Sequence, residues 1–404
     1  MSTSLLYQAL GIRGYRYLRT DYWGGEVVFS IEQIRANLHC PVCGSRQVTA
    51  HGHVPRLFRT VPIGSKATWV CFPIPRVACQ RCGVTRQVAV PFAEPQKHYT
   101  RAFERYALEL SQRMTIQDVA HHLGVSWDTI KDIQKRDLQR HFSKPKLRQL
   151  KRIAIDEISI GRGHRYLTVV LDLVSGAVVF VGDGKGADAL LPFWRRLRAS
   201  RAKIKAVATD MSLAYIQAVR EHLPRAVHVF DHFHVIKLFN DKLSAFRREL
   251  YREATVALHK KILKGTRWLL LKNPENLDPR RHERQRLEEA LRINQPLATV
   301  YYMKEDLRQI WLQPDKRTAA RVLQDWVHRA EASGIRLLRD FAVTLTMYRA
   351  GILAYYDHPI STGPLEGSNN KIKTMQRQAY GFRDHAFFKL KIYAIHKTKY
   401  ALVG

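Results

Sequence analysis

Between residues 148 and 235, short apolar runs alternate with amphipathic stretches, and their order constrains the fold more than any other feature. Short apolar runs bounded by turn residues predict strands, whereas apolar residues spaced by three and four predict helices. The predicted strands are 151–160, 166–173, 177–181, 203–209 and 226–230, and the predicted helices are 187–199, 213–222 and one that begins near 233. Three strands followed by alternating helices and strands are the order of an RNase H-like fold.

Three carboxylates occupy related places in this predicted fold. Asp156 lies on the first strand and Asp210 directly follows the fourth, so the two would be spatial neighbours. Glu366 falls in the first turn of a later helix, where Pro364 suits the first helical position. Carboxylate oxygens are the ligands that Mg²⁺ prefers. We therefore expect the three acids to hold two Mg²⁺ or Mn²⁺ ions per active site, about 3.5–4 Å apart, an arrangement that hydrolyses phosphodiester bonds.

Other acids nearby are assigned to different roles. Glu157 follows Asp156 and points to the opposite face of the strand. Asp172 falls within the predicted hairpin of strands, and Asp183 lies between glycines, where aspartate commonly makes local hydrogen bonds. We therefore assign neither Asp172 nor Asp183 to the metal site.

Residues 236–356 are predicted to be helical, with one break at 272–279. This stretch is too long for a connector and predicts an all-α insertion between the last strand and the helix of Glu366. We expect its tryptophans, Trp268, Trp311 and Trp326, to lie in the insertion's core. The alternative is that one of them stacks on an unpaired base.

Residues 1–95 carry a doubled cysteine motif. Strands are predicted on both sides of a Gly24-Gly25 turn. Two Cys-x-x-Cys pairs follow, each succeeded by glycine: Cys40, Cys43, Cys79 and Cys82. No secretory signal is evident at the N-terminus, so this spacing favours a four-sulfur structural Zn²⁺ site over disulfides. Cys71 is expected to be a core residue, and the alternative ligands are His39, His51 and His53.

Residues 96–147 have the pattern of a helix-turn-helix domain. Ala120 permits close helix packing, Gly124 makes the turn, Ser126 caps the second helix and Ile130 faces inward. The residues expected to face a DNA major groove are Ser126, Asp128, Thr129, Lys131 and Asp132. The alternative is that the unit only packs against other domains.

The charge balance points to a polyanionic partner. The chain contains 67 Lys and Arg against 35 Asp and Glu, a net charge of +32. These residues are spread along the chain, and no run reaches the roughly 18 apolar residues of a membrane span. Double-stranded DNA is therefore the expected partner, and no membrane association is expected. Near Glu366, we expect Lys371, Lys373 and Arg377 to bind DNA, and Asn370, one turn on, to support the site.

Taken together, these motifs resemble the bacterial insertion-sequence DDE transposases of the ISL-three family. The most specific pieces are residues 154–157, 209–212 and 363–370. The resemblance implies a zinc ribbon, a helix-turn-helix domain and an RNase H-like core, with Asp156, Asp210 and Glu366 as the catalytic triad. Related transposases also carry an acid-x-x-His pair, which implies that Asp231 and His234 lie beside the active site.

The function implied is a transposase that binds the terminal inverted repeats of its element, cuts the strands and joins them to target DNA. Such a protein would act as a homodimer on DNA and be found in the bacterial cytoplasm, associated with the nucleoid. The predicted divisions are 1–95, 96–147, 148–235, 236–356 and a closing core segment, 357–404. Two alternatives are an RNase H-like structure-specific nuclease, such as a junction resolvase, and a non-catalytic zinc and helix-turn-helix regulator.

Overall fold

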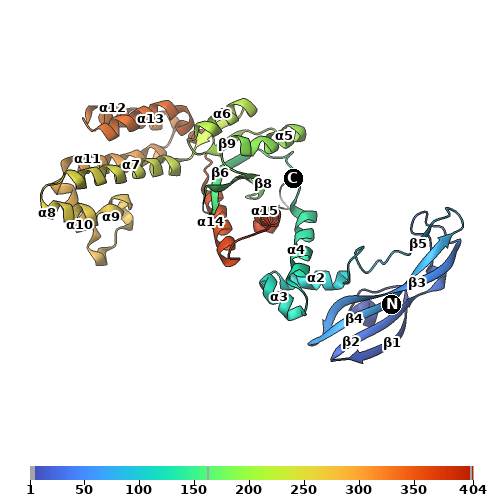
Figure 1. Ribbon diagram of the computed structural model, residues 1–404. Coiled ribbons are helices and arrows are strands. Elements are labelled where there is room, and N and C mark those ends of the chain that lie inside the picture. Colours follow the sequence, from blue (N-terminus) through green and yellow to red (C-terminus); the bar gives the residue numbers. More distant parts are fainter. Residues whose placement is uncertain (1–4, 162, 401–402, 404) are drawn as a thin grey trace. The chain divides into compact units, whose positions relative to one another are not determined.

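The computed structural model describes residues 5–161, 163–400 and 403 (Figure 1). It divides into two compact units, Met1–Arg140 and His141–Gly404. The predicted closing segment, 357–404, ends partly outside the described residues. Among the helices that the structure describes, none is long and apolar enough to cross a membrane.

The first unit combines a mixed sheet with the four helices α1 to α4. Strands β1 and β2 form the predicted hairpin around Gly24 and Gly25, both of which have positive φ. The sheet order is β1-β2-β4-β3, and β5 pairs with β4. The elements are α1 (Leu5–Gln8), β1 (Tyr15–Trp23), β2 (Glu26–Gln33), β3 (Val48–Ile63), β4 (Lys66–Cys79), β5 (Thr85–Gln87), α2 (Arg101–Leu110), α3 (Ile116–Leu123) and α4 (Trp127–Phe142).

Strand β3 is joined directly to the helices of the same unit. The buried guanidinium of Arg59 donates to the carbonyl of Leu123, the last residue of α3, at 2.9 Å. The hydroxyls of Thr60 and Thr100 lie 3.0 Å apart, and Thr100 caps α2. The sheet and the helices belong to one compact unit, and the predicted boundary between residues 95 and 96 falls within it.

The second unit contains a five-stranded sheet of order β10-β9-β6-β7-β8. Strands β6, β7 and β8 are antiparallel, and β9 and β10 run parallel to β6. This is the predicted RNase H-like arrangement. Its elements are β6 (Arg152–Gly161), β7 (Arg165–Asp172), β8 (Val178–Asp183), α5 (Leu191–Ser200), β9 (Ala206–Thr209), α6 (Leu213–His222) and β10 (Val227–Phe230).

Alternate residues of β6 face different partners. Ile153 and Ile155 join an apolar core with buried side chains of α5 and α6, including Trp194 and Tyr215. The other face of β6 packs against α14 (Gly363–Gln378), the helix that carries Glu366. Helices α15 (His385–Tyr393) and α16 (Lys397–Tyr400) follow α14, and α15 packs along β8.

The predicted helical insertion separates β10 from α14. It is built around its own large apolar core, to which Phe239, Trp326 and Phe341 contribute. The predicted break falls where α9 ends, and two short 3₁₀ turns follow it. The helices are α7 (His232–Glu253), α8 (Ala257–Gly265), α9 (Arg267–Leu271), α10 (Glu283–Ile293), α11 (Gln295–Arg308), α12 (Lys316–Ala332) and α13 (Arg336–Leu353).

Candidate active site and DNA-binding elements

Asp156 and Asp210 extend from adjacent parallel strands. In the register of β6 and β9, Ala154 lies opposite Ala208. Asp156 and Asp210 each follow two residues later, and side chains two residues apart on a strand share a face. Asp210 comes directly after β9, and its Oδ1 accepts a hydrogen bond from the amide of Ser212 at 3.0 Å. The sheet therefore directs the two carboxylates to one end of the same face.

The Asp156 carboxylate is largely enclosed and lies within electrostatic reach of other ionisable groups. Burial raises its pKa, and the negative charges of Asp210 and Glu157 act in the same direction. A hydrogen bond from the amide of Glu157, at 2.8 Å, and the nearby ring of His234 oppose this rise. Burial and the nearby negative charges disfavour the ionised form of Asp156 when no cation is present. A bound cation would favour the ionised form instead.

Asn369 holds the second oxygen of Asp156. Its Nδ2 donates to Oδ2 of Asp156 at 2.9 Å, and Asn369 itself is only 6% exposed. The Oδ1 atom of Asn369 is buried without a hydrogen-bond partner. An orphaned oxygen on a residue bonded to Asp156 matches the oxygen-donor preference of Mg²⁺, so the residues present fit such an ion.

The prediction chose Asn370 as the supporting asparagine, and the structure places a different residue against Asp156. Asn370 is exposed on α14, whereas Asn369 lies on the helix face that packs against β6. The buried positions Leu365, Ser368 and Ile372 define that face by their spacing of three and four. This spacing was present in the sequence and could have identified Asn369.

Glu366 lies in the first turn of α14, as predicted, and is exposed. It precedes Asn369 by three residues, so the two lie one helical turn apart. In the described part of the chain, the three predicted carboxylates do not form a group with ligand atoms within 4.8 Å of one another. The structure thus brings Asp156 close to Asp210. It places Glu366 on the adjoining helix, where its carboxylate is too far from the two aspartates for all three to bind one ion.

Asp231 fastens the start of α14 to the core. It is 1% exposed and caps α7 by accepting from the amide of Phe233 at 3.1 Å. Its Oδ2 also accepts from the amide of Thr362, at 3.1 Å, and from the Thr362 hydroxyl. Burial alone would raise the pKa of Asp231, but hydrogen bonds from His232, Thr362 and Phe233 outweigh it and lower that pKa to about 2. The charged carboxylate therefore ties β10 and α7 to α14 across the insertion.

Glu157 and Asp172 behave as predicted, whereas Asp183 ends β8 and pairs with the distant Lys389 instead of making local turn hydrogen bonds. Glu157 points to the opposite face, where it accepts from the hydroxyl of Tyr215 at 2.7 Å and from the amide of Gly186 at 2.9 Å. Asp172 accepts from the turn amides of Val174 and Ser175 at 3.1 and 3.0 Å. Asp183 is largely exposed and pairs with Lys389.

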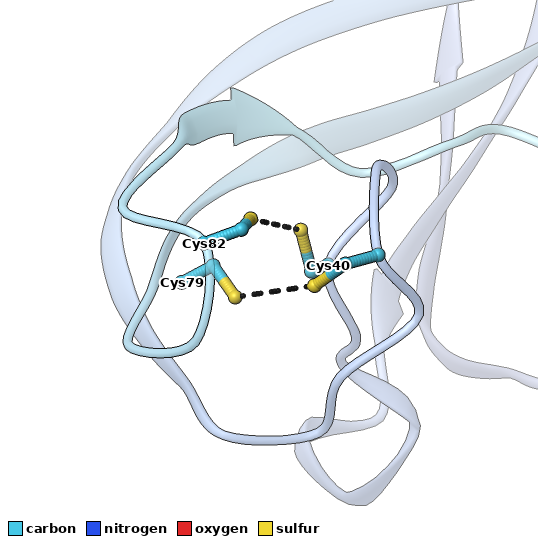
Figure 2. Close-up of side chains that lie close together, drawn as sticks. Cys40, Cys79 and Cys82 are labelled. Atoms are coloured by element: carbon cyan, nitrogen blue, oxygen red, sulfur yellow. Dashed lines mark hydrogen bonds between the residues drawn. The ribbon is translucent and has the colours of Figure 1, made fainter.

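The four motif cysteines converge, as Figure 2 shows for the sulfur atoms of both knuckles. Their Sγ atoms all lie within 4.8 Å of one another, with Cys40 3.6 Å from Cys82 and Cys43 3.6 Å from Cys79. Tetrahedral zinc with Zn–S bonds of about 2.3 Å requires sulfurs about 3.8 Å apart, so the set fits Zn²⁺. Hydrogen bonds from the amides of Cys43 and Val42 lower the pKa of Cys40 to about 6, which favours the thiolate.

The remaining candidates of this region lie outside the cluster. Cys71 is half-buried on β4 and is not part of the sulfur group. The histidines considered as substitutes, His39, His51 and His53, are also absent from it among the described residues. Gly44 and Gly83, which follow the two knuckles, both adopt φ of 70°, the left-handed conformation that suits a tight turn.

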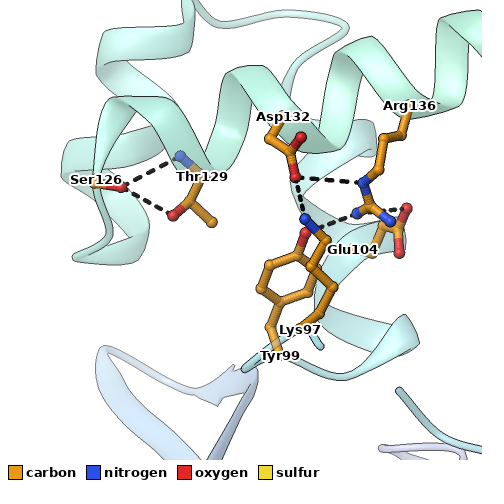
Figure 3. A network of polar contacts seen from close by, with 7 residues as sticks. All are labelled: Lys97, Tyr99, Glu104, Ser126, Thr129, Asp132 and Arg136. Atoms are coloured by element: carbon orange, nitrogen blue, oxygen red, sulfur yellow. Dashed lines mark hydrogen bonds and ion pairs between the residues drawn. The ribbon is translucent and has the colours of Figure 1, made fainter. Parts of the chain in front are cut away.

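Helices α3 and α4 form the predicted helix-turn-helix. Gly124 has φ of 60° and ends α3, and the Ser126 hydroxyl accepts from the amide of Thr129 at 3.2 Å (Figure 3). Ala120 and Ile130 are buried between the helices. The exposed start of α4 carries Asp128, which suits a recognition helix.

Asp132, predicted to face outward, is partly exposed, but its carboxylate is paired with cations of the same unit. Lys97 donates to its Oδ2 at 2.7 Å, and Arg136 lies 3.4 Å from the same oxygen (Figure 3). Arg136 also reaches Glu104 on α2 and the hydroxyl of Tyr99. Asp132 therefore holds α4 to the preceding segment. The prediction missed this because Lys97 is distant in sequence.

The tryptophans of the insertion differ in their surroundings. Trp326 is fully buried and Trp311 packs partly buried against the same core, as predicted. The prediction was wrong for Trp268, which is 65% exposed with the Arg267 guanidinium 4.7 Å from its ring centroid. The five-residue helix α9 buries Leu269 and Leu270, and this turns Trp268 to solvent.

Comparisons with known proteins agree across the chain. Residues 37–82 match the zinc-finger of transposases IS204, IS1001, IS1096 and IS1165, and residues 88–137 match the helix-turn-helix domain of transposase family ISL3. Residues 153–392 match the DDE transposase domain of the same family.

Two curated relatives cover most of this chain. The transposase for insertion sequence element IS1001 of Bordetella parapertussis is 35% identical over 88% of this chain and 88% of that protein. The transposase for IS1557 of Mycobacterium tuberculosis is 30% identical over 81% of this chain and 78% of that protein. Among solved structures, the Drosophila P element transposase strand transfer complex matches 74% of this chain and 92% of that chain, with 10% identity and a TM-score of 0.41. The chain belongs to the ISL3 family of transposases, with a zinc ribbon, a helix-turn-helix DNA-binding domain and a DDE catalytic domain.

Proposed function

We propose that Asp156, Asp210 and Glu366 are the catalytic carboxylates of this transposase and hold two divalent ions, Mg²⁺ or Mn²⁺. The observation that carries the proposal is the enclosed carboxylate of Asp156, directed with Asp210 from adjacent strands and bonded by Asn369 of the helix that bears Glu366. When bound, the ions would supply a nucleophile made from water and stabilise the leaving 3′-oxygen.

Each protein group has a distinct task in this mechanism. Asp156 and Asp210 offer oxygens from the rigid sheet, and Glu366 adds its oxygen from α14. Asn369 fixes the orientation of Asp156 by its hydrogen bond, and its free Oδ1 is positioned to accept from a water molecule. Asp231 holds the first turn of α14, and the ring of His234 lies near Asp156 and opposes the rise of its pKa.

The remaining regions bring DNA to this site. Ser126, Asp128, Thr129 and Lys131 would contact the terminal inverted repeats, and Lys371, Lys373 and Arg377 would contact phosphates near the cut. The four cysteines would hold structural Zn²⁺ and stabilise the ribbon. Because strand transfer joins two ends, we infer a homodimer on DNA, with the nucleoid as the place of action. The boundaries after residues 95, 147, 235 and 356 belong to the same proposal.

The test is strand cleavage of duplex DNA that spans the element's end and its flank, with Mg²⁺ present. Asp156→Asn, Asp210→Asn and Glu366→Gln should each lower the cleavage rate by at least about 10³-fold while end binding stays within twofold. Asp188→Asn, which changes an exposed carboxylate of the same unit, is the matched control and should cut normally. Normal cleavage by any of the first three variants would remove that residue from the catalytic set.

A further inference from the structure

Tyr380 adopts a backbone conformation that tyrosine normally avoids. It directly follows the end of α14 with φ of 50°, in the left-handed region. The amide of Gly381 donates to the carbonyl of Gln376 at 2.9 Å, and the amide of Tyr380 donates to that of Arg377 at 3.1 Å. These two bonds define a Schellman motif, in which glycine is usual at the position that Tyr380 occupies. A bulky residue held in a costly conformation points to a function.

The side chain of Tyr380 is fully exposed at 100% of its surface. Its backbone is nevertheless fixed on both sides, because Phe382 stacks on the buried Phe388 of α15 with ring centroids 4.6 Å apart. The helix end before it and this aromatic contact after it fix the backbone position from which the ring projects. Tyr380 thus presents an exposed aromatic face from a fixed point of the backbone.

The segment around Tyr380 is strongly basic. Residues 371–383 contain four cations and no acid: Lys371, Lys373, Arg377 and Arg383. Within the described residues, none of the four makes an ion pair. The adjacent acid, Asp384, accepts from the amide of Phe387 as the cap of α15. The positive charge of this segment is therefore available to a polyanion.

We propose that Tyr380 is a DNA-contacting residue that stacks on an unstacked base of the element's end, about 20 Å from the phosphate that is cut. An exposed aromatic face among unpaired cations combines the two elements of single-strand recognition, since the ring takes a base and the cations take its flanking phosphates. Tyr380 follows Ala379, the C-cap of α14, whereas Glu366 lies in the first turn of that helix, so the two residues are about 20 Å apart along the helix axis. The inference rests on the proposed DNA cleavage at that site and adds a residue that holds the substrate.

The experiment uses the full-length protein with two duplexes of the element's end. One is fully paired, and the other has unpaired bases about six positions from the cut, which is the length of duplex that about 20 Å spans. Tyr380→Ala should bind the unpaired duplex about tenfold more weakly than wild type, and the paired duplex within about twofold. Tyr380→Phe keeps the ring and should bind both duplexes normally. Tyr302→Ala removes an exposed tyrosine of α11 and is the matched control, with no change expected.

A glycine variant separates stacking from a structural role. Tyr380→Gly should raise the melting temperature by about 2–4 °C, because glycine adopts the left-handed conformation without strain, while weakening binding to the unpaired duplex like Tyr380→Ala. Equal binding of the unpaired duplex by wild type and Tyr380→Ala would overturn the inference. A Tyr380→Phe variant as weak as Tyr380→Ala would overturn it as well, because the ring alone would not suffice. The binding results hold whether or not wild type cuts, so they are independent of the cleavage proposal.

Discussion

The contact between Asp231 and Thr362 determines whether α14 is held against the core. Asp231→Ala removes the acceptor of two Thr362 bonds and of the Phe233 cap bond, all at a residue that is 1% exposed. Hydrogen bonds to charged groups contribute about 1.5–3 kcal/mol each, and loss of a buried network costs about 3–5 kcal/mol in total. Thr362→Val keeps the amide and removes only the hydroxyl, so it should cost about 1–2 kcal/mol.

The assay is a double-mutant cycle on the free energy of unfolding in urea, together with hydrogen exchange of the α14 amides. The hydroxyl has no acceptor once Asp231 is gone, so the double variant should be less destabilised than the sum, with a coupling of about 1–2 kcal/mol. Asp357→Ala, which breaks a half-exposed pair with Lys316, is the control and should cost under about 0.5 kcal/mol. Additive effects of the two substitutions within about 0.5 kcal/mol would refute the proposed role of the Asp231–Thr362 contact. Unchanged hydrogen exchange of the α14 amides would refute it as well.

Three further outcomes are expected. The pKa of Asp231 is about 2, against 3.8 for an unperturbed aspartate, so its stabilisation is complete above pH 3.8 and is lost as the pH falls toward 2. The difference in urea midpoint between wild type and Asp231→Asn should therefore narrow from pH 4.5 to 2.5, and a constant difference would contradict this. Removal of metal by a chelator, or Cys79→Ser, should expose residues 40–88 to protease because the cysteine knuckles lose their shared ion. Undiminished resistance of this segment to protease would argue against a zinc site. Trp326→Ala should lower the free energy of unfolding by about 3–5 kcal/mol and Trp268→Ala by under about 0.5 kcal/mol, since only Trp326 is buried. Equal losses of this free energy in urea unfolding would contradict the assigned environments.

The order of strands and helices in the catalytic unit could be predicted because each element carries a complete local signal. Helix α6, Leu213–His222, has the predicted bounds, and the hairpin of β1 and β2 was marked by Gly24-Gly25. The cysteine cluster was equally predictable, because two knuckles with the same spacing need one common ion.

Side-chain partners far apart in sequence could not be predicted. The ion pair of Asp132 with Lys97 depends on how the segment before α2 folds back, and no local pattern records that. The exposure of Trp268 depends on the direction of a five-residue helix, and apolar content alone does not give this direction. Choosing between Asn369 and Asn370 required knowing which face of α14 is buried. The spacing of the apolar residues Leu365 and Ile372 in the sequence does indicate that face.

The insertion between Asp231 and Thr362 has a consequence for synthesis of the chain. The DNA-binding unit is complete by Arg140, whereas Glu366 and Asn369 emerge from the ribosome only after all the helices of the insertion. A polypeptide that stops early therefore retains the ribbon and the helix-turn-helix but lacks α14. Such a fragment would occupy element ends without cutting them, so abortive translation would yield competitors of the full-length enzyme rather than partial nucleases.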